Sequence, residues 1–148
     1  MKKQLLLVAG LALLTSACAN LCESDCRQKP CKKGEVVYVA SAASSSASLF
    51  GFDSAKLTSA DEAALKATAA RLNDKANVGK KVTSNGYASM EGAASYNVDL
   101  SRRRAEAVKG YLVKEGVDAK RISVKGHGAT DAFGPTYPEN RRVEVVVD

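Results

Sequence analysis

The sequence predicts an α+β fold, a two-layer sandwich in which two main helices cover one face of a small mixed β-sheet. Its 148 residues are enough for one domain with a tail. Hydrophobic residues make up 45% of the chain, which is sufficient for a packed core. Strand-like segments alternate with two long helical patterns between residues 48 and 148, and this alternation is typical of a helical layer packed on a sheet.

Composition argues against several classes of enzyme and favours a binding protein. The chain has a single His and no CxxC motif, so a multi-ligand zinc site or a His-based catalytic triad has little to build on. Trp is absent and aromatic residues make up 5%, which argues against a stacking platform for sugars or bases. We therefore expect no enzymatic activity, no cofactor and no bound metal.

The first 17 residues are predicted to be a lipoprotein signal peptide. Lys2 and Lys3 precede an apolar run over 5–14, and small residues lead up to Cys18. The run is too short for a membrane-spanning helix, which needs roughly 20 residues. Small residues followed by Cys resemble the bacterial lipobox, where cleavage precedes a cysteine that becomes acylated. We expect acyl chains on Cys18, an outer-membrane location because Ala19 follows it, and a domain that faces the periplasm.

The processed chain has a modest positive charge. Cleavage before Cys18 removes Lys2 and Lys3, which lowers the net charge from +6 to +4. Acidic and basic residues are interleaved in the remainder, so nucleic acid is not an expected partner.

Residues 18–47 are predicted to form a lipidated tether that contains further cysteines. Cys22, Cys26 and Cys31 are disulfide candidates, because exported cysteines usually pair, and their odd number leaves one thiol free or paired between chains. A thiolate metal site is the less favoured alternative. The segment includes a strand-like patch at 36–39. Fully extended, the tether could reach about 100 Å, enough for an anchored domain to meet a target away from the membrane.

The folded part is expected over 48–148, and it begins with a strand and a helix. The strand is predicted at 48–52, with a turn at Asp53 and Ser54. Ser59 and Glu62 have the spacing of a capping box, so Ser59 is the predicted N-cap of the helix. At steps of three and four residues, the helix is expected to bury Leu65, Ala69, Leu72 and Ala76.

Later elements are predicted as a strand at 81–86, a helix at 93–115, a strand at 121–125 and a strand at 142–147. Gly116 is a plausible terminator of the long helix. In the last strand, alternate valines share one face. His127 and Asp131 fall in a predicted loop over 126–140. No nucleophile with a matched partner is visible there, so we expect an exposed loop histidine without catalytic function.

One basic residue of the second helix is predicted to point inward. At 100° per residue, Arg104 lies about 40° from Leu100, inside the apolar stripe that also contains Tyr111, and Asn97 shares that stripe. A buried guanidinium needs an anionic partner or several acceptors. Two alternatives remain open: an internal salt bridge to Asp53 or Asp99, and an arginine that binds a ligand carboxylate.

Several motifs, in order along the chain, are those of a known family. They are Phe50 to Leu57, Gly86 with Tyr96 and Asn97, Leu100 to Ala105, Gly116 and Val117, Arg121 and Ile122, Gly126 to Gly128, and Asn140 to Glu144. Together they resemble the OmpA-like C-terminal domain family, which includes peptidoglycan-associated lipoproteins and flagellar stator proteins. The resemblance covers about residues 48–148 and implies an OmpA-like sandwich.

The resemblance also implies a non-enzymatic function. Members of the family bind the diaminopimelate-bearing stem peptide of peptidoglycan, between the turn after the first strand and the start of the second long helix. By this resemblance Arg104 holds the carboxylate of diaminopimelate, Asn97 is the neighbouring polar residue, and Phe52 and Asp53 line the adjacent turn.

The chain departs from the family at one site position. Where the family has an aspartate that meets the ammonium group of the ligand, this chain has Ser89. Loss of a charged acceptor costs about 1.5–3 kcal/mol, or roughly ten- to a hundredfold in affinity. Glu91 could partly replace the missing carboxylate.

Two functions of different classes follow. In the first, the protein is an outer-membrane lipoprotein whose domain binds peptidoglycan and ties the membrane to the cell wall. In the second, the domain binds the wall weakly or not at all and acts as a protein-interaction or assembly module, with other envelope proteins as partners. Ser89 favours the second, whereas Arg104, Asn97 and the predicted anchor favour the first.

Overall fold

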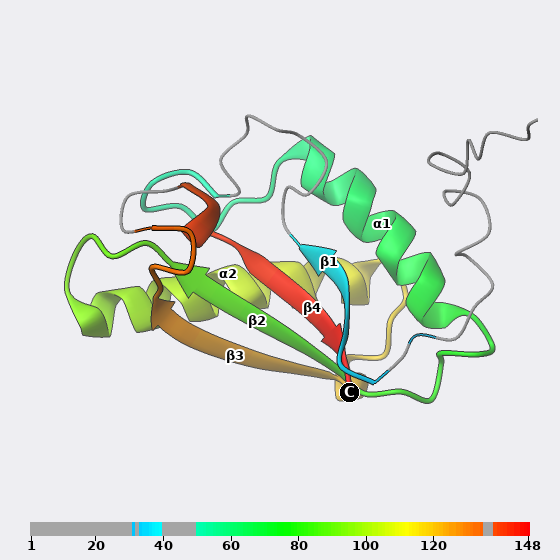
Figure 1. Ribbon diagram of the computed structural model, residues 1–148. Helices are drawn as coiled ribbons and strands as arrows, with labels where there is room; N and C mark the ends of the chain where they lie inside the picture. Colours follow the sequence, from blue (N-terminus) through cyan, green and yellow to red (C-terminus); the bar gives the residue numbers. More distant parts are fainter. Residues whose placement is uncertain (1–30, 32, 40–49, 135–137) are drawn as a thin grey trace, which may run out of the picture.

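The fold is a four-stranded mixed sheet packed against two helices (Figure 1). The computed structural model describes residues 31, 33–39, 50–134 and 138–148. The strands are β1 (Glu35–Val39), β2 (Val82–Ala88), β3 (Ile122–Ala129) and β4 (Val143–Val147). The helices are α1 (Ser59–Asn73) and α2 (Ala94–Lys114), with short 3₁₀ turns at Ala119–Arg121 and Pro138–Asn140. The predicted α+β sandwich is thus confirmed.

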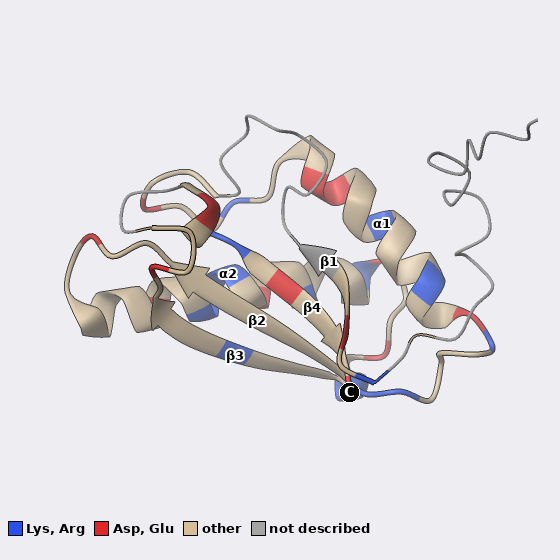
Figure 2. Cartoon of the chain, in the orientation of Figure 1, with Lys and Arg blue, Asp and Glu red and all other residues tan. Residues whose placement is uncertain are grey.

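The sheet has the order β1-β4-β2-β3. β2 and β3 are parallel, whereas β4 is antiparallel to both of its neighbours. The alternate valines of β4, Val143, Val145 and Val147, are fully buried in a core that both helices share, as their alternation predicts. Charges of both signs are distributed along the helices and loops and do not gather on one element (Figure 2).

β1 corrects the expected boundary between tether and domain. It lies in the segment predicted as tether, yet it pairs with β4 from Glu35 opposite Val147 to Val39 opposite Glu144. Cys31 is also buried, with 2% of its surface exposed. The β-branched residues of the patch add an edge strand to the sheet, so the described fold begins at Cys31, before the predicted start at 48. Residues 1–30, with the signal peptide and Cys18, Cys22 and Cys26, lie outside the described residues.

The strand predicted at 48–52 is wrong over its described part. Residues 50–52 form a bend and the start of a turn, in which the Ser54 amide donates to the carbonyl oxygen of Gly51 (3.1 Å). Asp53 has a φ of 53°, a left-handed conformation that extended backbone excludes. Phe50 is buried and donates its amide to the carbonyl oxygen of Arg141 (3.1 Å), so this segment packs on the core without joining the sheet.

The capping box of α1 is formed one residue earlier than predicted. Thr58 is the N-cap: its hydroxyl accepts from the Asp61 amide (3.2 Å), and the Asp61 carboxylate accepts from the Thr58 amide (3.0 Å). A reciprocal pair of this kind is equally well made by Thr and Asp at the same spacing as Ser and Glu. The predicted burial of Leu65, Ala69 and Leu72 is confirmed. Ala76 is exposed, because the helix ends at Asn73.

β3 is longer than predicted and includes His127. Its side chain is exposed, as expected, but it belongs to a strand and not to a loop. The ring stacks on Tyr87 of β2 with 4.9 Å between centroids, and Nε2 lies 2.9 Å from Oδ1 of Asn85.

No helix in the described part of the chain is long and apolar enough to cross a membrane.

Two glycines let α2 approach the sheet closely. A Cβ built on Gly86 of β2 would overlap the carbonyl oxygen of Ser101, and one built on Gly126 of β3 would lie 2.7 Å from the amide nitrogen of Arg102. Both neighbours are backbone atoms of α2, which cannot move aside singly. The absence of a side chain at these positions therefore sets the distance between the helix and the sheet.

We predict that Gly86→Ala destabilises the fold, because α2 must move away from β2. The expected loss in the free energy of unfolding is about 1–3 kcal/mol, the usual cost of overpacking. Gly110→Ala is the control, since a Cβ at this position of α2 meets nothing within 4 Å. It should leave stability unchanged or raise it by up to about 1 kcal/mol. Urea denaturation measures both, and equal stability of the two variants would contradict close packing at Gly86.

Candidate ligand-binding pocket

A cavity of about 190 Å³ lies between the turn at 51–54, the β2–α2 connection and the first half of α2. It contains all five ligand-site residues predicted from the sequence. Its lining consists of Phe52, Asp53, Ser89, Glu91, Gly92, Tyr96, Asn97, Leu100, Arg104 and Arg141. Residues more than 50 positions apart in the sequence thus meet in one pocket.

Arg104 is the most deeply buried charged residue of the pocket, with 0% of its surface exposed. Its guanidinium donates to three backbone carbonyl oxygens: Nε to Ser54 (2.8 Å), one terminal nitrogen to Tyr87 (3.1 Å) and the other to Gly51 (3.1 Å). An ion pair with Asp53 or Asp99, one of the two alternatives left open by the sequence, is absent among the described residues. Several neutral acceptors therefore compensate the buried charge.

The pocket is electrostatically suited to an anion. The pKa of Arg104 is lowered to about 10, mainly by burial and also by the nearby charge of Arg141, whereas the charge of Asp53 acts in the opposite direction. At neutral pH Arg104 remains a cation. Two guanidinium groups thus contribute to one small cavity, and a carboxylate bound there would relieve their mutual repulsion.

Asp53 and Tyr96 connect the two sides of the pocket. The Tyr96 hydroxyl, on the first turn of α2, donates a hydrogen bond to Oδ1 of Asp53. Asp53 is held in the left-handed conformation described above, and Phe52 beside it exposes 74% of its surface. A strained turn with an exposed aromatic residue beside a pocket is a common feature of binding sites.

Ser89 and Asn97 supply neutral polar groups. Asn97 is 2% exposed and donates Nδ2 to the carbonyl oxygen of Glu91 (3.0 Å), which fixes the β2–α2 connection. Ser89 is 6% exposed, and its hydroxyl has no hydrogen-bond partner among the described residues. Glu91 itself is exposed at the rim. Its carboxylate can reach a ligand only from the solvent side.

The groups that line the pocket are suited to binding a ligand. His127 and Asp131 do not line it. In the described ranges no three His, Cys, Asp or Glu side chains gather where they could hold a metal ion. The pocket combines the N–H donors of arginine, amide and hydroxyl groups, and the carboxylate of Asp53, which is hydrogen-bonded to Tyr96. This combination is suited to holding a small zwitterionic or anionic group.

Two polar residues of the lining, Arg141 and Tyr96, were not predicted from the sequence as site residues. Both lie inside motifs on which the family resemblance rests, so these motifs could have indicated them as site residues. Arg141 also donates Nε to the carbonyl oxygen of Phe50 (2.9 Å), which ties the start of β4 to the turn of the pocket.

Of the disulfide candidates, only Cys31 lies in the described residues. It is a free thiol buried in the core, and burial raises its pKa. A thiol of this kind is protected from solvent and reacts slowly.

All residues that line the pocket lie in a segment of the chain that matches a known protein family. Residues 49–145 match the model of the OmpA family. The chain is similar to the peptidoglycan-binding protein ArfA of Mycobacterium tuberculosis, with 39% identity over 104 residues, 67% of this chain and 31% of ArfA. It is 42% identical over 79 residues to the peptidoglycan-associated lipoprotein of Haemophilus influenzae, covering 53% of this chain and 50% of that protein.

A solved structure agrees with these sequence matches. The peptidoglycan-associated lipoprotein from Burkholderia pseudomallei has a TM-score of 0.59 and 26% identity, over 67% of this chain and 86% of that one. The matched part thus spans only 31% of ArfA and 50% of the Haemophilus influenzae lipoprotein. With its family segment and its sheet and helices in agreement, the chain belongs to the OmpA family.

Proposed function

We propose that the domain binds peptidoglycan non-covalently, by taking the side-chain terminus of diaminopimelate in a stem peptide into the pocket, and that it is not an enzyme. The observation that carries the proposal is the convergence of Arg104, Asn97, Ser89, Asp53 and Phe52 on one cavity. The printed names of two relatives, a peptidoglycan-binding protein and a peptidoglycan-associated lipoprotein, support it.

The donors of Arg104 are sufficient for a ligand. A guanidinium has five N–H groups, and three of those of Arg104 donate to backbone carbonyls. Two are left for a carboxylate, and the Ser89 hydroxyl can accept a hydrogen bond from the ammonium group of the same ligand terminus. The ammonium group of the same ligand terminus finds its countercharge at Asp53 or, from the rim, at Glu91. At about 190 Å³ the cavity is smaller than pockets for drug-sized ligands, so it suits one side-chain terminus and not a disaccharide.

We further propose that the chain is a lipoprotein anchored in the outer membrane through Cys18, with the domain in the periplasm. In this arrangement the protein ties the outer membrane to the cell wall. Two or three acyl chains provide a stable anchor, whereas a single chain binds membranes only marginally.

Co-sedimentation of the full chain with insoluble peptidoglycan is the direct test. We expect the protein to sediment with peptidoglycan in the pellet. A soluble stem peptide that contains diaminopimelate should release the protein into the supernatant. A folded protein that stays in the supernatant would overturn wall binding and would favour the protein-interaction function instead.

We predict that Ser89→Asp strengthens binding of the stem peptide roughly ten- to a hundredfold, the equivalent of about 1.5–3 kcal/mol. Both carboxylates of the lining, Asp53 and Glu91, are exposed, and Asp53 already accepts a hydrogen bond from Tyr96. An added carboxylate at 89 gives the ligand ammonium a fixed countercharge. Titration calorimetry with wild type, Ser89→Asp and Arg102→Ala measures the effect.

Arg102 is the matched control because it is exposed on the same helix and pairs with Asp99 and Glu106 outside the pocket. Its removal should leave the affinity unchanged. Weaker binding by Ser89→Asp than by wild type would mean that the ligand presents no ammonium group at this position.

We predict that Arg104→Met destabilises the domain by at least about 3 kcal/mol, because three carbonyls lose a charged donor at roughly 1–3 kcal/mol each. Arg103→Met, one residue away and exposed, should change stability by less than about 0.5 kcal/mol. Thermal denaturation compares the two. Equal stability would show that the three hydrogen bonds contribute nothing, and loss of binding in Arg104→Met could then be assigned to the ligand contact alone.

We predict that Cys18→Ala abolishes incorporation of labelled fatty acid and releases the protein from the outer-membrane fraction. The sulfur and the new amino group of Cys18 are the acylated atoms in the proposed anchor. Labelling of the variant at the wild-type level would contradict the lipoprotein assignment without affecting the proposal for the pocket.

A further inference from the structure

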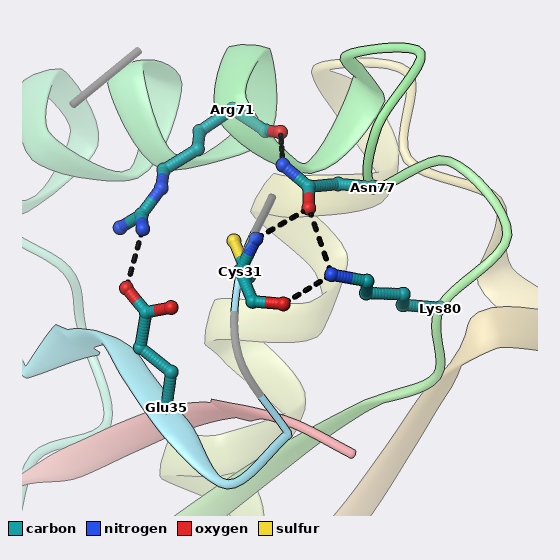
Figure 3. Close-up of polar contacts among 5 residues, drawn as sticks. All are labelled: Cys31, Glu35, Arg71, Asn77 and Lys80. Carbon is teal, nitrogen blue, oxygen red and sulfur yellow. Dashed lines mark hydrogen bonds and ion pairs between the residues drawn. The ribbon is translucent and has the colours of Figure 1, made fainter. Parts of the chain in front are cut away.

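The chain enters the described fold through a buried hydrogen-bond cluster, shown in Figure 3. Asn77, 1% exposed, accepts from the amide of Cys31 through Oδ1 (2.7 Å) and donates Nδ2 to the carbonyl oxygen of Arg71 (2.9 Å). Lys80 donates from Nζ to the carbonyl oxygen of Cys31 and to Oδ1 of Asn77 (3.3 Å). Both backbone polar groups of Cys31 are therefore held. We call Cys31, Asn77 and Lys80 the entry clamp.

Two further contacts continue the clamp into the sheet. The Gly34 amide donates to the carbonyl oxygen of Val147, and Glu35 forms an ion pair with Arg71 of α1. From Glu35 onward the chain is β1, paired with β4 as far as Val39. The entry clamp and β1 thus form one continuous attachment to α1, the α1–β2 turn and β4.

The entry clamp and the pocket lie at opposite ends of the sheet. Glu35 and Val82 both pair with Val147, at the end where the clamp lies and where Figure 1 shows the C-terminus. Gly86 pairs with Val143 at the other end, two residues from Arg141 of the pocket. The seven residues of β2 separate the two ends by about 23 Å at roughly 3.3 Å per residue.

This placement decides how a pulling force would act on the sheet. A force between the pocket and the chain before Cys31 runs along the axis of β1, since β1 begins at the clamp end and leads toward the pocket end. Hydrogen bonds of an antiparallel pair are perpendicular to the strands. Such a force loads all the β1–β4 bonds together, in shear, and none can break alone.

We propose that β1 and the entry clamp form a force-transmitting joint, which passes tension from the segment before Cys31 through β4 to the pocket. The inference rests on the proposed function, in which one end of the protein is held by the membrane and the other by the cell wall. A domain placed between two such attachments experiences tension whenever the membrane and wall separate. Its resistance depends on the rate of forced unfolding.

The fold offers an internal comparison. The Gly34 amide contacts Val147, so the chain before Cys31 and the C-terminal Asp148 leave the sheet at the same end. A force between these two points would separate β1 from β4 one hydrogen bond at a time. The same strand pair is therefore strong in one pulling direction and weak in the other.

Single-molecule force spectroscopy on the full chain, unacylated and under reducing conditions, tests the proposal. One handle is attached before residue 31. The second handle is attached either beside the pocket or at the C-terminus. For the attachment beside the pocket, the exposed residue Met90 is replaced in the variant Met90→p-azidophenylalanine. We expect a rupture force several-fold higher for the Met90 attachment. Equal forces in the two directions would overturn the joint.

Variants of the entry clamp add a second criterion. Lys80→Met removes the donors to Cys31 and Asn77 but keeps the side-chain stem, and it should lower the rupture force measured from Met90. Lys75→Ala, an exposed residue of the same turn, is the control and should not change it. A Lys80→Met protein with an unchanged rupture force would exclude the clamp from the joint. These measurements use no peptidoglycan, so failure of the joint and failure of wall binding are distinguishable.

Discussion

The pocket depends on the guanidinium of Arg104, which links α2 to two other segments of the chain. Its donors reach the carbonyl oxygens of Gly51 and Ser54 in the turn and of Tyr87 at the end of β2. A cation at this position also defines what the pocket can bind, so the same side chain assembles the site and sets its charge preference. The structural and ligand-binding interpretations of Arg104 are therefore complementary.

The glycines of the sheet make this arrangement possible. Gly86 and Gly126 let the backbone of α2 rest directly on β2 and β3 near Ser101 and Arg102. With the helix at that distance, an arginine two residues farther along α2 reaches across the end of β2. Larger residues in the strands would lift the helix, and the guanidinium would then lose its carbonyl partners. Packing at the glycines and hydrogen bonding at Arg104 are parts of one constraint.

Much of the fold could be predicted from the sequence, because the signals involved are periodic. The alternation of β4 and the apolar stripe of α2 depend on local spacing, and the inward position of Arg104 follows from the latter. The hydrogen-bond partners of Arg104 could not be predicted, because they are backbone carbonyl groups. Every residue has such a group, so the pattern of side chains in the sequence does not identify them. The convergence of the site residues required the family resemblance, because Asp53 and Ser89 carry no signal of their own.

The errors have a common physical origin. Segment 48–52 has strand-like residues, but its described part bends at Phe50 and turns from Phe52, and the buried Phe50 donates its amide to Arg141 outside the sheet. The patch at 36–39 is short and flanked by tether-like composition, and it becomes a strand only because β4 offers an unpaired edge. In both cases tertiary context overrides local propensity, as is usual for short strands.

β4 is the element that relates the two ends of the molecule. At one end Val147 pairs with the start of β1, and at the other Arg141, just before the strand, lines the pocket and donates to Phe50. Between them, three valines are fully buried under both helices. Burial of that kind contributes about 1.5–3 kcal/mol per side chain, so β4 cannot shift without disrupting the core. A strand fixed this firmly couples the entry of the chain to the geometry of the pocket, although the two are separated by the length of the sheet.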